Sequence, residues 1–213
     1  MRDGSGAVIR PAGTSWQLGV RIQHFRRLEL GVGSWTTIGL AMTEARLILI
    51  CGLPGSGKTK LAKQLEQEVR AVRFSPDEWK HDLDIDYYDE QRRVRLEQRL
   101  WRLGQELLAL GQSVILENGF WAREERDELR LGARTLGVAV ELHYLEAPVD
   151  DLWPRLEIRN ELAMPGTVPI KREDLDKWAA QFEAPEAAEL ALFDEAATSP
   201  LPDIRGAQQW PQR

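Results

Sequence analysis

Residues 46–59 read RLILICGLPGSGKT, and this stretch decides the fold. The run RLILIC, residues 46–51, is apolar after its first residue, which is typical of a strand buried on both faces of a parallel sheet. The run GLPGSGKT, residues 52–59, fits the pattern G-x-x-x-x-G-K-[ST] at every defined position and leads into a helical pattern. The strand, loop and helix together predict an α/β protein whose loop binds phosphate groups.

The glycines of this loop let successive backbone N–H groups turn toward a phosphate, and the positive end of the following helix adds to their effect. Lys58 is expected to reach the β- and γ-phosphates of a nucleotide, and Thr59 to offer its hydroxyl to Mg²⁺. A glycine-rich turn that binds nothing is disfavoured, because the pattern and its context agree. We therefore predict binding of ATP with Mg²⁺. The predicted nucleotide-binding residues are Gly52, Leu53, Pro54, Gly55, Ser56, Gly57, Lys58, Thr59 and Lys60.

Outward from this motif, apolar strand patterns alternate with amphipathic helix patterns. The alternation predicts right-handed βαβ units, and therefore a three-layer fold with a parallel sheet and helices on both faces. It leaves open whether a fifth strand lies near the C-terminus. The expected strands are 46–51, 71–74, 113–116 and 138–145, and the expected helices are 58–70, 91–110, 123–136, 150–160 and 172–182.

Three regions are predicted along the 213 residues. Residues 1–41 are rich in glycine and lack apolar periodicity, so they form either a poorly structured extension or a stretch upstream of a true start at Met42. Residues 42–195 are expected to form one α/β domain that contains the phosphate loop. Residues 196–213 carry three prolines and are expected to be a loop-like tail.

The overall composition limits the classes of binding partner and of cellular setting that we expect. A net charge of −6 argues against a protein that mainly coats nucleic acid, which needs a basic face. Cys51 is the single cysteine of the chain, so no internal disulfide forms and a reducing, cytoplasmic setting is expected. The sequence has neither a signal-peptide pattern nor an apolar run of the ~20 residues that cross a membrane.

Asp77 follows the second expected strand, within the run FSPDEWK of residues 74–80. The carboxyl ends of parallel strands form the edge where ligands bind. A carboxylate there can accept the proton of an attacking hydroxyl group. Asp77 is therefore a candidate catalytic base. Ser-Pro-Asp-Glu is also a good helix start, so a capping role for Asp77 stays open, and the two roles are compatible.

Two further features are candidates for catalysis. Glu117 closes the third apolar strand, a position suited to holding Mg²⁺ directly, through water, or to facing the substrate. Arg155 and Arg159 lie four residues apart on one expected helix, before the loop of residues 164–169. Mobile arginines that close over a phosphoryl group stabilise its charge. The alternative for both arginines is an ordinary surface ion pair.

The runs LILICGLPGSGKT, FSPDEW, SVILENGFWAREERDEL and HYLEAP with RLEIRN together resemble the small P-loop kinases known as AAA-type ATP-binding proteins. That group is similar to polynucleotide 5′-kinase domains, chloramphenicol phosphotransferase and the zeta toxins. By position, Asp77 matches the family's catalytic base, Lys58 and Thr59 its phosphate and magnesium residues, and Arg155 and Arg159 its lid arginines. The chain departs from the pattern at Glu117, where Asp is common, and at Lys80, where polynucleotide kinases carry Arg.

The resemblance implies transfer of the γ-phosphate of ATP to a hydroxyl group of a small molecule. The change to Lys80 weakens the case for a polynucleotide, because lysine does not bind phosphate bidentately. A polynucleotide 5′-hydroxyl kinase and a non-kinase nucleotide switch are the alternatives. Acceptor specificity is expected to lie in residues 82–105 and around Phe120 and Trp121, and Trp79 and Trp121 could stack on a planar substrate.

Overall fold

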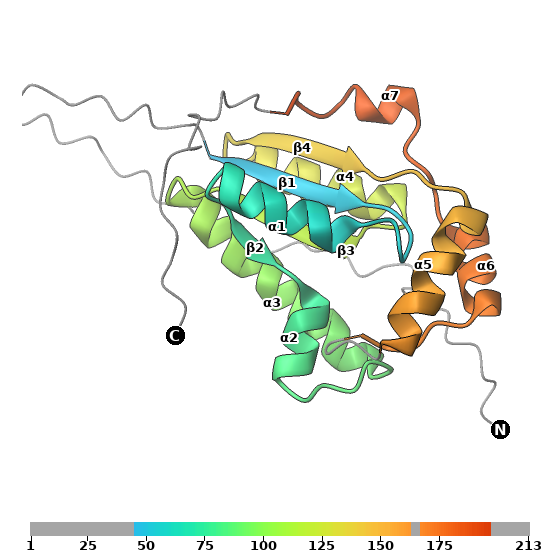
Figure 1. The fold of residues 1–213 in the computed structure, drawn as a ribbon. Coiled ribbons are helices and arrows are strands. Elements are labelled where there is room, and N and C mark those ends of the chain that lie inside the picture. The colour runs from blue at the N-terminus through green and yellow to red at the C-terminus, as the bar shows by residue number, and fades with distance from the viewer. Residues whose placement is uncertain (1–44, 163–166, 197–213) are drawn as a thin grey trace, which may run out of the picture.

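Four parallel strands form the central sheet, in the spatial order β2-β3-β1-β4 (Figure 1). The computed structural model describes residues 45–162 and 167–196. The region expected over 1–41, and all but residue 196 of the expected tail, lie outside the described residues. The strands are β1 (Arg46–Cys51), β2 (Val72–Phe74), β3 (Val114–Gly119) and β4 (Ala139–Tyr144).

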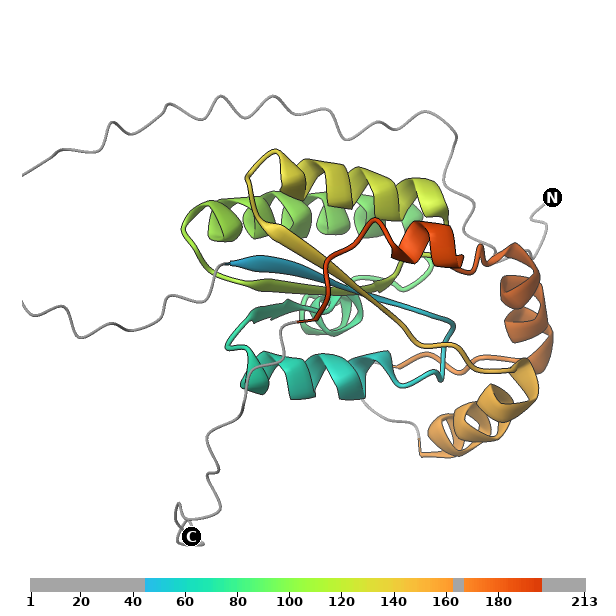
Figure 2. The ribbon, with the colours of Figure 1, turned by 90° about the horizontal axis from the view of Figure 1, so that it is seen from above.

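Strand β1 is buried on both of its faces, as its unbroken apolar sequence predicted. Leu47, Leu49 and Cys51 pack on the side of α3 (Glu90–Ala109) and α4 (Arg123–Arg134). Ile48 and Ile50 face α1 (Lys58–Glu68) on the other side. Figure 2 shows α3 and α4 on one face of the sheet and α1 on the opposite face. The predicted three-layer α/β fold is confirmed.

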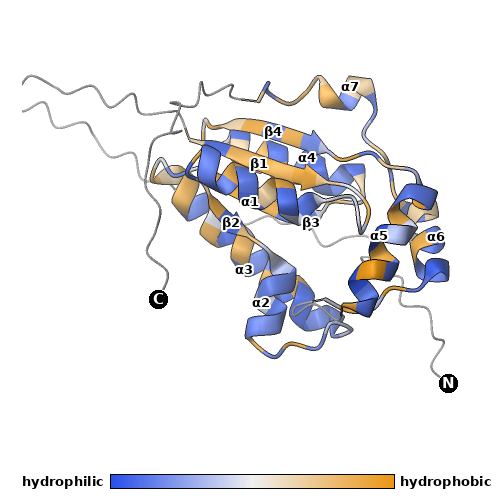
Figure 3. Cartoon of the chain, in the orientation of Figure 1, coloured by the Kyte–Doolittle hydropathy of each residue, from blue (hydrophilic) through white to orange (hydrophobic). Residues whose placement is uncertain are grey.

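The remaining helices lie at or beyond the carboxyl end of the sheet. Helix α2 (Pro76–Asp82) follows β2, and α5 (Val149–Glu161) follows β4. Helix α6 (Arg172–Gln181) packs on α5 through a small apolar core of its own. Apolar residues concentrate in the strands, while the helices carry many hydrophilic residues (Figure 3). No helix among the described residues is long and apolar enough to cross a membrane.

Several element boundaries differ from the sequence-based prediction. Helix α1 ends at Glu68 rather than Arg70, because Arg70 adopts a left-handed φ of 51° that a helix cannot contain. Strand β3 continues past Leu116 to Gly119, so that Glu117 lies inside the strand. The short helix α7 (Ala187–Leu190) was not predicted. The described part of the chain has no fifth strand; instead Asp194 pairs with Val140 at the edge of β4, through backbone and side chain.

A buried ion pair fastens α7 to the rest of the domain. Arg126 on α4 is fully buried and donates to both carboxylate oxygens of Glu189, at 2.5 and 2.9 Å. Its remaining terminal nitrogen donates to the Phe120 carbonyl oxygen at 2.9 Å, just beyond the end of β3. Burial of two charges is tolerated here because they are paired and hydrogen-bonded. The segment after α6 is thus fixed close to the sheet edge that carries the functional residues.

Candidate functional site

The phosphate loop connects β1 to α1, as its sequence predicted. Gly55 and Gly57 have φ values of 82° and 99°, in the left-handed region that favours glycine. A Cβ atom on Gly55 would lie 3.1 Å from Leu156 on α5, and Leu53 packs in the α5–α6 core. The backbone N–H of Gly52 donates to the Gly119 carbonyl oxygen at 3.2 Å, which ties the loop to β3. Apolar packing and strand pairing therefore hold the loop from both sides.

Lys58 lies folded back over the loop that it belongs to. Its ammonium donates to the carbonyl oxygens of Gly52 and Leu53, each at 2.9 Å. Burial lowers its pKa to about 8, against the opposing attraction of Asp77 and other nearby groups. The Ser56 hydroxyl is buried and has no hydrogen-bond partner among the described residues. An orphaned hydroxyl and a poorly solvated ammonium are both groups that an anionic phosphate would satisfy, so the loop fits a nucleotide.

Asp77 lies in the first turn of α2 and does not cap it. The N-cap is Ser75, with Pro76 at the first helical position, so the capping alternative for Asp77 is wrong. The carboxylate is 72% exposed, and it accepts from the Lys80 ammonium at 2.7 Å. Asp77 also raises the pKa values of Lys58 and Arg159 against the lowering effect of their burial. The fold thus brings this candidate base close to two of the predicted phosphate-binding cations.

Glu117 is held by a neighbour that the sequence did not indicate. Its Oε1 accepts from Arg73 on β2 at 2.8 Å, and its Oε2 is buried with no hydrogen-bond partner among the described residues. Burial raises its pKa, while the nearby Ser75 hydroxyl and Arg73 lower it. Arg73 also pairs with Glu78 and Glu66, and these ion pairs fix the carboxylates next to α2.

Magnesium bound with a nucleotide takes much of its coordination from phosphates and water, so it needs few protein ligands. No group of three or more His, Cys, Asp or Glu residues within 45–162 and 167–196 could hold a metal ion by itself. The hydroxyl of Thr59, in the first turn of α1, and the unpartnered Oε2 of Glu117 are hard oxygen donors of the type that Mg²⁺ prefers. This donor set fits a nucleotide-borne ion.

The two predicted lid arginines both lie on α5 but in different settings. Arg159 is half-buried; its Nε has no partner among the described residues, and burial lowers its pKa. Arg155 is exposed, and its guanidinium lies 3.4 Å from the Gly55 carbonyl oxygen. Residues 164–166 of the expected loop 164–169 lie outside the described residues. Asn160 pins the following segment by donating to the Ile170 carbonyl oxygen at 2.7 Å and accepting from its N–H at 3.1 Å.

Three features of the site escaped the sequence-based analysis. Lys80 is only 5% exposed, and Arg73 binds three carboxylates. The two hydrogen bonds between Asn160 and the backbone of Ile170 were also missed. The i, i+3 spacing of Asp77 and Lys80 was the one local signal available, because residues three apart share a helix face. Of the two tryptophans proposed to stack on substrate, Trp79 is 39% exposed and lies edge-on to Phe74, and Trp121 packs against Trp178.

Comparisons with known proteins agree with this fold. A protein from Chloroflexus aurantiacus described as a kinase is 21% identical, with a TM-score of 0.56 over 68% of this chain and 83% of that chain. A chain of the Pnkp1/Rnl/Hen1 RNA repair complex is 18% identical, with a TM-score of 0.56 over 71% of this chain and 47% of the other. Kti12 from Chaetomium thermophilum, in complex with ADP-AlF₃, is 19% identical with a TM-score of 0.51, over 67% and 82%. At these identities the likeness establishes the fold.

No curated protein sequence matches the chain. A family model described as an AAA domain matches residues 47–185, which contain the phosphate loop, Asp77, Glu117 and both lid arginines. With the P-loop kinase-like fold and the built phosphate loop, this match places the chain in the AAA domain family of nucleotide-binding proteins.

Proposed function

We propose that this protein is an ATP-dependent phosphotransferase that phosphorylates a hydroxyl group of a small molecule. The observation that carries the proposal is the position of Asp77. An exposed carboxylate lies at the carboxyl end of the sheet, near both Lys58 of the phosphate loop and Arg159 of α5. A base next to phosphate-binding cations is what in-line transfer to a hydroxyl requires.

In the proposed reaction, Asp77 accepts the proton of the acceptor hydroxyl as its oxygen attacks the γ-phosphorus of ATP. The bond between the γ-phosphorus and the β–γ bridging oxygen breaks, ADP leaves with that oxygen, and the proton passes from Asp77 to solvent. Because the Asp77 carboxylate is largely exposed, an acceptor can reach it without a rearrangement of the core.

Cations on the other side of the reacting atoms stabilise the phosphoryl group. Lys58 leaves the Gly52 and Leu53 carbonyl oxygens and bridges the β- and γ-phosphates, which offer a stronger partner for its charge. Arg159 and Arg155 lie on α5 and neutralise negative charge on the oxygens of the phosphoryl group during its transfer. When bound, Mg²⁺ neutralises phosphate charge; Thr59 would hold it directly and Glu117, already committed to Arg73, through water.

The alternative acceptor, a polynucleotide 5′-hydroxyl, is favoured by one observation. One structural neighbour belongs to an RNA repair complex. However, Lys80 is buried and paired with Asp77 rather than displayed along a basic groove, and the whole chain carries a net charge of −6. Non-specific binding of nucleic acid depends on such basic surfaces. We therefore favour a small acceptor.

Transfer of label from γ-labelled ATP into a pool of cell metabolites tests the proposal. The Asp77→Asn variant runs beside the native protein, and ATP binding is measured for both. We expect a new labelled small molecule with the native protein alone. Label that appears only as free phosphate, equally in both proteins, would instead identify a nucleotide switch or simple ATPase. Label in added oligonucleotides would identify the polynucleotide kinase.

A further inference from the structure

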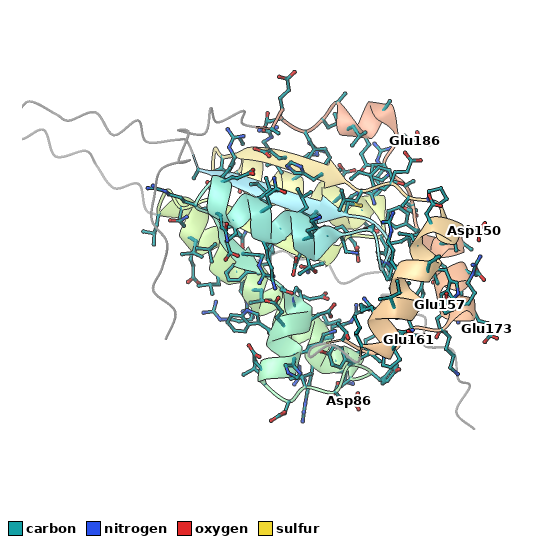
Figure 4. The ribbon with its side chains drawn as sticks, in the orientation of Figure 1. Asp86, Asp150, Glu157, Glu161, Glu173 and Glu186 are labelled. Atoms are coloured by element: carbon teal, nitrogen blue, oxygen red, sulfur yellow. The ribbon has the colours of Figure 1, made fainter. Side chains whose placement is uncertain are left out.

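An open cavity lies beside α2, and it is lined in part by Lys80, the partner of Asp77. Its volume is about 300 Å³, within the range of small-molecule pockets. It is formed by the end of α2 and the loop that leads to α3, within the region where acceptor specificity was expected. The lining residues are Lys80, His81, Asp84, Ile85, Asp86 and Tyr87. Figure 4 labels Asp86 in this loop.

Lys80 links this cavity to the proposed base. Its ammonium binds Asp77 Oδ1 at 2.7 Å and lies over the Tyr87 ring, 4.7 Å from the ring centre. The Tyr87 hydroxyl lies 3.4 Å from the Asp77 carbonyl oxygen and donates to it. A lysine that is only 5% exposed has lost most of its hydration, and an ammonium has three donors. Asp77 takes one donor and the ring covers another side, so a third N–H can reach a ligand in the cavity that Lys80 lines.

The charges around the cavity are mostly negative. Asp84 and Asp86 line it, Asp77 pairs with the lining residue Lys80, and Asp82 is near enough to act on Tyr87. Burial raises the pKa of Tyr87 first, and the charges of Asp77 and Asp82 raise it further. The cations near Asp77 that are predicted to bind phosphate, Lys58 and Arg159, do not line this cavity. A phosphate or carboxylate group on the acceptor would therefore be repelled from the cavity.

We propose that this cavity is the acceptor subsite and that it takes a polyhydroxylated molecule of about monosaccharide size without any anionic group. Lys80 donates to an oxygen next to the hydroxyl that Asp77 deprotonates, and Asp84 and Asp86 accept from the other hydroxyl or amino groups. The proposal rests on the proposed phosphotransferase activity, and it names the class of acceptor for that site.

The first experiment divides a cell-metabolite pool by ion exchange at neutral pH into anionic, neutral and cationic fractions. Each fraction is then incubated with γ-labelled ATP and the full-length protein. We expect a labelled product from the neutral or the cationic fraction. Label from the anionic fraction alone would overturn the subsite assignment but leave the kinase intact. No label from any fraction, with ATP still bound, would overturn the phosphotransferase itself and this inference with it.

The second experiment assigns the role of Lys80 with the acceptor so found. Lys80→Met keeps the apolar stem and removes the donor, so we expect the KM for the acceptor to rise roughly 10- to 100-fold while the KM for ATP stays constant. Lys80→Arg should restore part of the affinity. The matched control is Lys63→Met, which removes an exposed lysine paired with Glu78 on the outside of α1. An unchanged acceptor KM in a folded Lys80→Met protein would refute the role.

The third experiment tests whether Asp84 and Asp86 exclude anionic acceptors from the cavity. Asp84→Asn with Asp86→Asn keeps the side-chain shapes, including an oxygen that can accept from the Tyr88 N–H as Asp86 does. We expect this variant to phosphorylate anionic analogues of the acceptor at least tenfold faster than the native protein does. The control variant, Glu68→Gln with Glu106→Gln, removes the same charge from the exposed far ends of α1 and α3. Equal effects of the two variants would show a long-range charge effect and contradict exclusion by Asp84 and Asp86.

Discussion

The phosphate loop and the proposed acceptor subsite are built in different ways. The nucleotide side is one continuous loop, shaped by glycine backbone and fixed by the packing of Leu53 and Gly55 against α5. The proposed acceptor side is a set of polar side chains on α2 and the loop after it, joined through Lys80 and Tyr87. Asp77 lies on the border between the two. A loop shaped by backbone is suited to the phosphates that all nucleoside triphosphates share, whereas a subsite lined by side chains could change specificity without a change of fold.

Substitution of Asp77 should give the largest difference between the effect on catalysis and the effect on nucleotide binding. Asp77→Asn removes the proton acceptor and leaves the phosphate loop intact, so we expect kcat to fall roughly 10²- to 10⁴-fold. The Kd for ATP should change by less than about threefold, because the Asp77 carboxylate is largely exposed and solvent screens its charge at the phosphate loop. Steady-state kinetics and calorimetric titration with ATP measure the two quantities. A parallel loss of ATP binding would mean that the two sides are one structural unit.

Lys58 should give the next largest effect, on the nucleotide side. Lys58→Met removes the cation that stabilises the transferring group, and we expect turnover to fall roughly 10²- to 10³-fold together with ATP affinity. Binding of the acceptor, measured without nucleotide, should stay within a factor of about two. A loss of acceptor binding in this variant would contradict the division of the site.

The same substitution should stabilise the unliganded protein. Lys58 has a folded-state pKa of about 8, below its ordinary value of 10.5, so its charged form is disfavoured in the fold. Between these two pH values the unfolded chain holds more protons, and the free energy of unfolding therefore rises with pH. Lys58→Met removes a charge that burial destabilises. We expect the free energy of unfolding at pH 7, measured by urea denaturation, to rise by about 1–2 kcal/mol. Lys60→Met, an exposed neighbour, should leave stability unchanged and serves as the control.

The two lid arginines offer a smaller test within α5. Arg159 is half-buried and coupled to Asp77, while Arg155 is exposed and touches only the rim of the phosphate loop. We expect Arg159→Met to lower kcat roughly 10- to 100-fold and Arg155→Met to lower it by less than about tenfold. Stopped-flow turnover under saturating ATP distinguishes these values. The reverse order would place Arg155, and not Arg159, over the reacting phosphate.

The contrast between the two sides also explains what could be predicted from the sequence. The buried strand, the phosphate loop and α1 are contiguous, so local rules for burial, glycine turns and helical periodicity sufficed to predict them, apart from the C-terminal end of α1. Arg73 and Glu117 are 44 residues apart, and they meet only because β2 and β3 pair in register. Arg126 and Glu189 are 63 residues apart and lie on separate helices. No local pattern encodes such contacts, and they depend on strand order and helix packing.

The role of Asp77 shows a different limit. The pattern Ser-Pro-Asp-Glu was compatible with a cap at either Ser75 or Asp77, because both residue types accept from helix N–H groups. Pro76 settles the choice in the structure, since proline is favoured at the first helical position and lacks the N–H that would need a partner. The neglected signal was therefore the proline. A stricter use of its position would have freed Asp77 from the capping role.

The pH dependence of nucleotide binding should give the smallest effect. It tests whether burial of Lys58 in the phosphate loop lowers the pKa of its ammonium. If burial over the loop carbonyls sets the Lys58 pKa at about 8, its protonated fraction falls roughly tenfold between pH 7 and pH 9, and ATP affinity should fall with it. Magnesium-saturated titrations at half-unit pH intervals measure this slope, and Lys58→Met should show none. Acceptor binding does not involve Lys58, so its pH profile should be the same in the native protein and in Lys58→Met. A native protein with constant ATP affinity up to pH 9 would show that burial does not hold the Lys58 pKa at about 8.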